Sequence, residues 1–260
     1  MHGTVKTRDL QKVYDSGGER TKAIEDLNFT VDSGEFLSVV GPSGCGKSTL
    51  LYLIAGFLDV SGGEILVDGE PVEGPGTDRG VVFQDYALFP WRTVEKNVTY
   101  GLEQNGVEKS ERKRIAEEYI DMMDLTGFED SYPKELSGGM RQRVSLARTL
   151  AYDPKILLMD EPFGALDQPL RESLQDHLLK IWRDLGKTVI FITHDVEEAV
   201  YLSERVLIMT RRPGTKKSVV PIDLDRSVGR EQVITSEEFH DLKSTVWTSL
   251  REETQPEVQV

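Results

Sequence analysis

The segment EFLSVVGPSGCGKS, residues 35–48, decides the fold because a short apolar run leads directly into a glycine-rich loop. Residues 41–48 match the pattern GxxxxGK[ST], in which glycines let successive backbone N–H groups curl around phosphate oxygens. The residues that follow, STLLYLIAGFL, have helical character, so the positive end of a helix faces the bound anion. We therefore predict a strand, a phosphate-binding loop and a helix.

This loop predicts binding of ATP together with Mg²⁺. Lys47 is expected to reach the β- and γ-phosphates, and Ser48 to offer its hydroxyl to Mg²⁺. Cys45, the only cysteine, is assigned no chemistry because a small side chain is enough there. The ATP-binding residues predicted here are Gly41, Pro42, Ser43, Gly44, Cys45, Gly46, Lys47, Ser48 and Thr49. A glycine-rich turn without a ligand is the alternative.

A second motif, ILLMDE at residues 156–161, places two carboxylates at the end of an apolar run. It predicts a buried strand that ends at the sheet edge carrying the glycine-rich loop. Asp160 is expected to hold the Mg²⁺ shell and Glu161 to orient the attacking water. Alone, this pattern also describes a strand end that meets solvent. Together with the loop it predicts ATP hydrolysis.

A third motif, LSGGMRQ at residues 136–142, places a serine and two glycines at a helix start. It predicts a second anion site formed by Ser137, Gly138, Gly139 and Met140. In isolation, Ser137 would be interpreted as an ordinary helix N-cap.

The rest of the chain indicates an α/β fold. The first 31 residues predict an antiparallel β region, and residues 107–125 predict an amphipathic helix with a charged outer face. From residue 139 onward, apolar strands alternate with helices, which predicts a mainly parallel sheet covered on both faces. After Arg211 we expect one further helix, residues 236–253, and a disordered tail, TQPEVQV.

Composition narrows the possible ligands and locations. Asp and Glu number 45 against 31 Lys and Arg, so the net charge of −14 argues against nucleic acid as the main ligand. The acidity favours solubility, with a high-salt cytoplasm as the alternative interpretation. The N-terminal residues lack the apolar stretch of a signal peptide, and no window approaches the roughly 18 to 20 apolar residues of a membrane span. We expect a cytoplasmic protein.

In order and spacing, the three motifs, Gln84, Ala165-Leu166-Asp167 and His194 resemble the ATP-binding cassette (ABC) ATPases of transporters. The resemblance implies a P-loop NTPase, RecA-like core with an N-terminal antiparallel β subdomain and a helical insertion at about residues 88–150. Residues 1–215 would form the ATPase domain and residues 216–260 a short C-terminal extension.

The resemblance also assigns roles to single residues. Tyr14 resembles the aromatic that stacks on adenine, although a tyrosine at a strand end is as often a packing residue. Gln84 resembles the glutamine that contacts Mg²⁺ and the attacking water, and His194 the histidine that bonds the γ-phosphate. The implied catalytic residues are thus Glu161, His194 and Gln84, with Ser48, Gln84 and Asp160 at the metal.

Partners are implied as well. In the family, the serine-glycine motif of a second subunit covers the γ-phosphate, which implies a head-to-tail homodimer with Asp167 near its interface. The exposed aromatic stretch with Leu88, Phe89 and Trp91 is expected to receive a cytoplasmic helix of a membrane permease. Alternatively, Phe89 and Trp91 pack the insertion onto the core.

The strings LFPWRTV and RPG are similar to the importer subgroup for nitrate, sulfonates and taurine. This implies a peripheral subunit at the cytoplasmic face of the membrane that powers uptake of a small solute and depends indirectly on a solute-binding protein. An exporter or release-system ATPase, a soluble ABC ATPase and a nucleotide switch without turnover are the competing functions. The solute itself is not encoded in an ATPase subunit.

Overall fold

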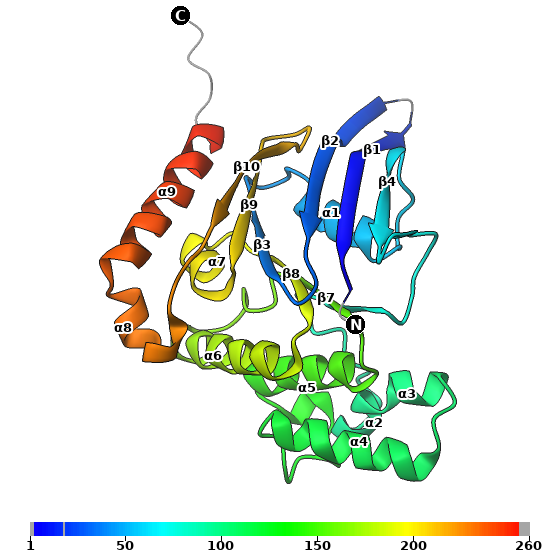
Figure 1. The fold of residues 1–260 in the computed structure, drawn as a ribbon. Coiled ribbons are helices and arrows are strands. Elements are labelled where there is room, and N and C mark those ends of the chain that lie inside the picture. Colours follow the sequence, from blue (N-terminus) through cyan, green and yellow to red (C-terminus); the bar gives the residue numbers. More distant parts are fainter. Residues whose placement is uncertain (1–2, 18, 255–260) are drawn as a thin grey trace, which may run out of the picture.

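The computed structural model describes residues 3–17 and 19–254 and has two sheets (Figure 1). The smaller sheet is antiparallel, with the strand order β2-β1-β4-β5. The larger sheet has the order β10-β9-β3-β8-β7-β6, in which all neighbours except β9 and β10 run parallel. The strands are β1 Val5–Ser16, β2 Glu19–Val31, β3 Phe36–Val40, β4 Gly62–Val67, β5 Glu70–Pro71, β6 Arg79–Val82, β7 Ile156–Asp160, β8 Thr188–Ile192, β9 Arg205–Met209 and β10 Lys216–Pro221.

Helices cover the larger sheet and form a separate layer below it in Figure 1. They are α1 Lys47–Ile54, α2 Val94–Val98, α3 Tyr100–Gln104, α4 Lys109–Met122, η1 Pro133–Glu135, α5 Gly138–Ala151, α6 Gln168–Leu185, α7 Val196–Leu202, η2 Arg226–Val228, α8 Arg230–Ile234 and α9 Glu237–Thr254. The α/β fold with a mainly parallel sheet and an antiparallel N-terminal sheet is confirmed.

The parallel strands are buried on both faces, which explains their continuous apolar sequences. Along β8, Val189 and Phe191 belong to one apolar cluster, while Ile190 and Ile192 belong to another. The first cluster includes residues of α5, α6 and α7, and the second includes residues of α1 and the antiparallel sheet. The period of two residues in a strand thus divides the core into two layers.

The C-terminal part contains more structure than the sequence predicts. The predicted helix at residues 236–253 is present as α9, but β10, η2 and α8 precede it. Strand β10 pairs antiparallel with β9 at the sheet edge and is only half-buried, so it lacks a long apolar run. Helix α8 has only five residues, too few for a helical period. Of the tail predicted to be disordered, residues 255–260 lie outside the described residues.

Candidate nucleotide site

The glycine-rich loop joins the end of β3 to the first turn of α1. Gly46, the N-cap of α1, has a φ of 107°, a left-handed conformation that favours glycine. A Cβ at Gly46 would lie 3.0 Å from the carbonyl oxygen of Ala23 in β2. The backbone of β2 thus packs directly against the loop, and only glycine fits there without displacement.

Lys47 is a buried cation at the mouth of this loop, with 8 % of its surface exposed. Its Nζ donates to the carbonyl oxygens of Gly41 at 2.8 Å and Pro42 at 3.2 Å. Both acceptors are neutral, and in the part of the chain that the structure describes no carboxylate lies at hydrogen-bond distance from this ammonium. The ammonium is therefore available to an anion that enters the loop.

Ser48 and Asp160 meet across the space between α1 and β7. The Ser48 hydroxyl donates to Asp160 Oδ1 at 3.1 Å. Burial raises the pKa of the Asp160 carboxyl, and the Ser48 hydrogen bond opposes that rise. A hydroxyl and a carboxylate beside a phosphate loop are the oxygen donors that Mg²⁺ accepts when it is bound together with a nucleotide.

Glu161 follows β7 in an unusual backbone conformation. Its φ is 44°, and its N–H donates to the carbonyl oxygen of Ile192 at 3.0 Å. A non-glycine residue in this region carries strain, which is a frequent property of functional sites. The Glu161 Oε2 lies 2.9 Å from His194 Nδ1, and His194 is the second residue after the end of β8. Neighbouring parallel strands thus bring the two groups together at one sheet edge.

Most of these residues line one cleft with a volume of about 700 Å³. Tyr14 stands at its border, with its hydroxyl 3.2 Å from the Thr49 hydroxyl and its side chain partly exposed. The lining residues are Tyr14, Ala23, Ser43, Gly44, Gly46, Lys47, Ser48, Thr49, Glu161, His194 and Arg212. The cleft thus combines an aromatic ring, a phosphate loop, a carboxylate and an imidazole.

Two lining residues, Ala23 and Arg212, were not assigned from the sequence, and Arg212 is the charged one. It lies in the turn between β9 and β10, where Gly214 N donates to the Ala23 carbonyl oxygen at 2.9 Å. A Cβ at Gly214 would lie 2.1 Å from the Cys45 carbonyl oxygen, so this turn packs tightly against the glycine-rich loop. The string RPG indicates the importer subgroup. Only the packing of the turn shows that Arg212 reaches the cleft.

Known proteins are similar to this chain in sequence and in fold. Residues 24–164 match the ABC transporter family. The chain belongs to the ABC transporter family. It is 54 % identical, over 97 % of this chain and 93 % of the relative, to an uncharacterized ABC transporter ATP-binding protein of Methanocaldococcus jannaschii. The nitrate import ATP-binding protein of Synechocystis is 50 % identical, over 86 % of this chain and 84 % of the relative. The taurine import ATP-binding protein of Escherichia coli is 49 % identical, over 82 % of each.

A solved structure agrees with this assignment. This ABC ATPase superposes with a TM-score of 0.75 on a dimeric ATP-binding cassette in a post-hydrolysis state, bound to ADP and Pi. The identity is 33 %, over 84 % of this chain and 99 % of that one. The resemblance predicted from the motifs, and the prediction of an ATPase, are confirmed.

The serine-glycine motif of this ABC ATPase does not line the nucleotide cleft of its own chain within the described residues. Ser137 is the N-cap of α5, and its hydroxyl accepts from Met140 N at 3.3 Å. A Cβ at Gly139 would lie 2.6 Å from Leu170 in α6, so Gly139 permits the close approach of α5 and α6. Asp167 is the N-cap of α6 and accepts from Leu170 N at 3.2 Å.

Gln84 lies just after β6 and is exposed. A Cβ at Gly164 would lie 3.8 Å from both Gln84 Nε2 and Glu161 Oε2, so the two side chains flank the same glycine. Gln84 is nevertheless not among the described residues that line the cleft.

The three predicted partner-contact residues have different surroundings. Trp91 is 71 % exposed, Phe89 is half-buried, and Leu88 packs against the main core. The Phe89 ring centroid lies 4.4 Å from that of Tyr100 and 5.8 Å from that of Trp91. Phe89 therefore packs against Tyr100 of α3, Trp91 projects outward, and Leu88 is partly buried against the main core.

Proposed function

We propose that the cleft binds Mg-ATP and that Glu161 and His194 carry out its hydrolysis. The observation behind this proposal is that Lys47, Ser48 and the Glu161–His194 pair line one cleft. Asp160 lies behind this lining, hydrogen-bonded to Ser48. Lys47 and the loop amides would bind the phosphates. Ser48 and Asp160, assisted by Gln84, would hold Mg²⁺, which neutralises charge on the phosphates.

Hydrolysis requires a water molecule in line with the γ-phosphate. The Glu161 carboxylate is suited to orient this water and accept its proton, while the His194 imidazole holds Glu161 through the 2.9 Å contact. The Glu161 carboxylate and a γ-phosphate oxygen are both hydrogen-bond acceptors, so His194 would contact both at the same time with both of its ring nitrogens protonated.

A second copy of the chain would complete the site. Ser137 to Met140 lie outside their own cleft among the described residues, yet they present a helix start suited to phosphate. The solved cassette with TM-score 0.75 is dimeric. In a head-to-tail dimer the motif of one subunit covers the nucleotide of the other, and Asp167 lies near the shared surface. ATP then favours the closed dimer because it contacts both halves.

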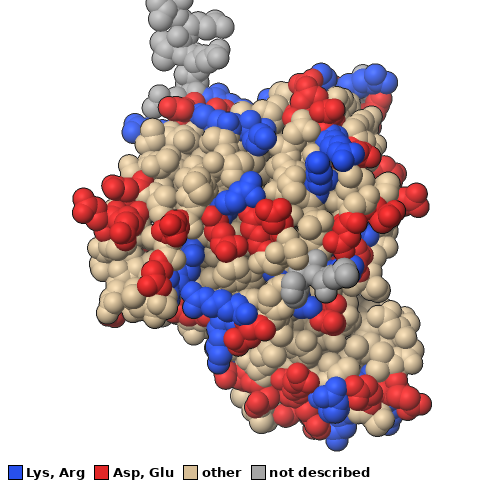
Figure 2. All heavy atoms as spheres, in the orientation of Figure 1, with Lys and Arg blue, Asp and Glu red and all other residues tan. Residues whose placement is uncertain are grey.

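The dimer would power an importer at the cytoplasmic face of the membrane. Two relatives at about half identity are named as import proteins for nitrate and taurine. No helix within the described residues is long and apolar enough to cross a membrane. The proposed partners are integral permease subunits and, indirectly, a solute-binding protein, with a small solute of the nitrate, sulfonate or taurine kind. Nucleic acid is not a proposed partner, and acidic and basic side chains are interspersed on the face in Figure 2.

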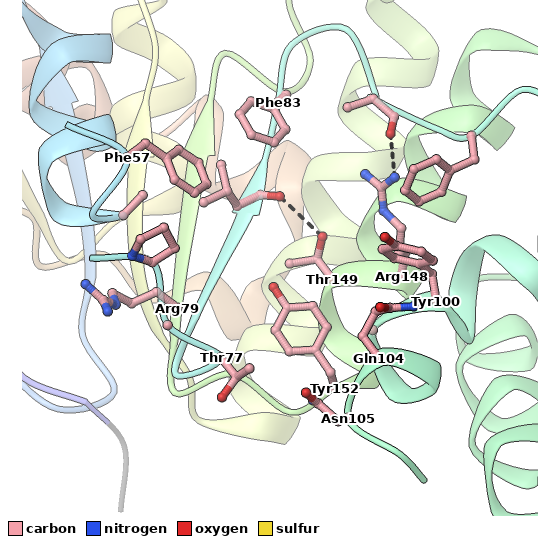
Figure 3. A pocket seen from close by; sticks show the side chains of 17 residues that line it. Phe57, Thr77, Arg79, Phe83, Tyr100, Gln104, Asn105, Arg148, Thr149 and Tyr152 are labelled. Atoms are coloured by element: carbon pink, nitrogen blue, oxygen red, sulfur yellow. Dashed lines mark hydrogen bonds between the residues drawn. The ribbon is translucent and has the colours of Figure 1, made fainter. Parts of the chain in front are cut away.

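The proposed binding site for a permease helix is an apolar pocket of about 450 Å³ (Figure 3). Phe57 and Phe83 stack on one side with centroids 6.3 Å apart, and Tyr100 and Tyr152 lie across from them. Arg148 donates to the Ala87 carbonyl oxygen at 2.5 Å, and this hydrogen bond holds the segment that contains Ala87 at the edge of the pocket. Phe89 lines the pocket, the Trp91 ring contacts Phe89, and Leu88 is the preceding residue, so all three stay in the proposed contact surface.

Replacing Trp91 tests this docking surface. We expect Trp91→Ala to lower the affinity for permease by about 30-fold, because exposed tryptophans at interfaces contribute about 2 kcal/mol or more. The measurement is the yield of companion chains that co-purify from membranes, identified by mass spectrometry. Trp247→Ala is the control, since Trp247 in α9 is also exposed, at 56 %. Equal yields from both variants would refute the assignment, and the identity of the companions separates import from export and from a soluble role.

Replacing Arg212 tests its place in the nucleotide cleft. An exposed cation that faces a triphosphate or a base contributes about 0.5–1 kcal/mol, so Arg212→Ala should raise the Kd for ATP by about two- to fivefold. Arg212→Glu should raise it further because a like charge then faces the phosphates. Calorimetric titration with Mg-ATP measures both. Arg114→Ala on the outer face of α4 is the matched control, and an Arg212→Glu affinity equal to that of this control contradicts the assignment.

A further inference from the structure

The C-terminal part of the chain is fastened to the helix that follows His194. Arg226 donates to the carbonyl oxygens of Tyr201 at 2.6 Å and Val200 at 3.2 Å, at the C-terminal end of α7. Lys243 in α9 donates to Glu197 in α7 at 2.6 Å. In Figure 1, α8 and α9 run along the side of the molecule that carries α6 and α7. The C-terminal part is therefore connected directly to α7.

A continuous series of hydrogen bonds, called the row below, connects α8 to residues 193–195. These three residues form the His194 loop. Arg230 Nη2 donates to Gln175 Oε1 at 2.7 Å, and Gln175 Nε2 donates to Glu198 Oε1 at 2.9 Å. The Thr193 hydroxyl donates to Glu198 Oε2 at 2.5 Å and accepts from Asp195 N at 3.0 Å. The row thus ends on the two residues that flank His194.

The His194 loop depends on these anchors because the imidazole has little packing of its own. The His194 side chain is 68 % exposed, and its contact with Glu161 is its one hydrogen bond in the described part of the chain. Gln175 and Glu198 are instead buried, with 3 % and 6 % of their surfaces exposed. Burial raises the pKa of the Glu198 carboxyl, and its hydrogen bonds to Thr193 and Gln175 oppose that rise. A buried polar row is costly unless each member is paired, and paired members hold one another in fixed positions.

We propose that Arg230, Gln175 and Glu198 are positioning residues for ATP hydrolysis, acting through Thr193 on His194. The proposal rests on the role proposed above for His194. Under this proposal the C-terminal extension contributes to the positioning of His194, because Arg230 of α8 is the outermost member of the row. Arg230 is itself held by Asp176 at 3.0 Å and lies over the Tyr201 ring at 4.3 Å, so its guanidinium has a defined orientation.

The test measures kcat and KM for ATP hydrolysis with the full chain. We expect Arg230→Ala and Gln175→Met each to lower kcat by about 5- to 10-fold, with KM for ATP changed less than about twofold. Gln175→Met interrupts the row and leaves the other Arg230 contacts in place. The double variant should be no slower than the slower single variant, because both cut the same row. Arg230→Lys keeps one donor and should recover part of the loss.

Lys217→Ala is the control, because Lys217 binds Glu252 at 2.8 Å and fastens β10 to α9 without contacting the row. A kcat for Arg230→Ala and Gln175→Met equal to that of Lys217→Ala overturns the positioning role, as do losses that add in the double variant. His194→Ala separates the two proposals. If His194→Ala hydrolyses ATP at the wild-type rate, the proposed role of His194 is wrong. If His194→Ala is slow but Gln175→Met is as fast as wild type, only the positioning role of the row is wrong.

Discussion

Lys47→Ala is expected to abolish nucleotide capture at ordinary concentrations, with the Kd for Mg-ATP raised by at least about 100-fold. Within residues 3–17 and 19–254, the buried ammonium is hydrogen-bonded only by the carbonyl oxygens of Gly41 and Pro42, so its charge can attract the phosphates. Loss of such a desolvated charge pair costs about 3 kcal/mol or more, which corresponds to this factor. Calorimetric titration with Mg-ATP gives the value directly.

Two variants make this result specific. Lys47→Arg keeps the charge but not the compact ammonium, and should lose most of the affinity because a planar guanidinium cannot reproduce the contacts of the ammonium with Gly41, Pro42 and the phosphates. Lys113→Ala removes an exposed lysine of α4 and should bind like wild type. The electrostatic account of the cleft is wrong if Lys47→Ala binds Mg-ATP with undiminished affinity while it remains folded.

Glu161→Gln is expected to lower kcat by about 10²- to 10⁴-fold while ATP binding is retained. Glutamine has nearly the same shape as glutamate and can still contact His194, but it cannot accept the proton of the attacking water. Phosphate release over time gives kcat, and titration gives the affinity. Because ATP then stays intact, the variant should also accumulate as a dimer on sizing in saturating Mg-ATP.

Glu64→Gln is the matched control, since Glu64 in β4 is exposed and pairs only with Arg8 among the described residues. It should hydrolyse ATP like wild type and should not accumulate as a dimer. A Glu161→Gln protein that hydrolyses ATP at the wild-type rate contradicts the catalytic role of Glu161. A monomeric Glu161→Gln protein in saturating Mg-ATP contradicts the two-subunit site.

Much of the nucleotide site was predictable because its motifs are local. Residues 41–48 are contiguous, so the spacing of glycines, lysine and serine already specifies a phosphate loop. The pairing of Ser48 with Asp160, 112 residues apart, followed from the rule that parallel strands end at one edge. Arg212 was not predictable in this way, since its place depends on how the β9–β10 turn packs against Ala23 and Cys45.

The sequence by itself determined the family, the α/β fold class and the phosphate-binding loop, because contiguous motifs and apolar periodicity are properties of neighbouring residues. Only the tertiary structure decided that Arg212 reaches the cleft, that Leu88 faces the core, and that Ser137 lies outside its own nucleotide cleft. The row from Arg230 to Thr193 likewise joins α8, α6 and α7. Such contacts arise from the packing of distant segments, and no local pattern in the chain encodes the distance between them.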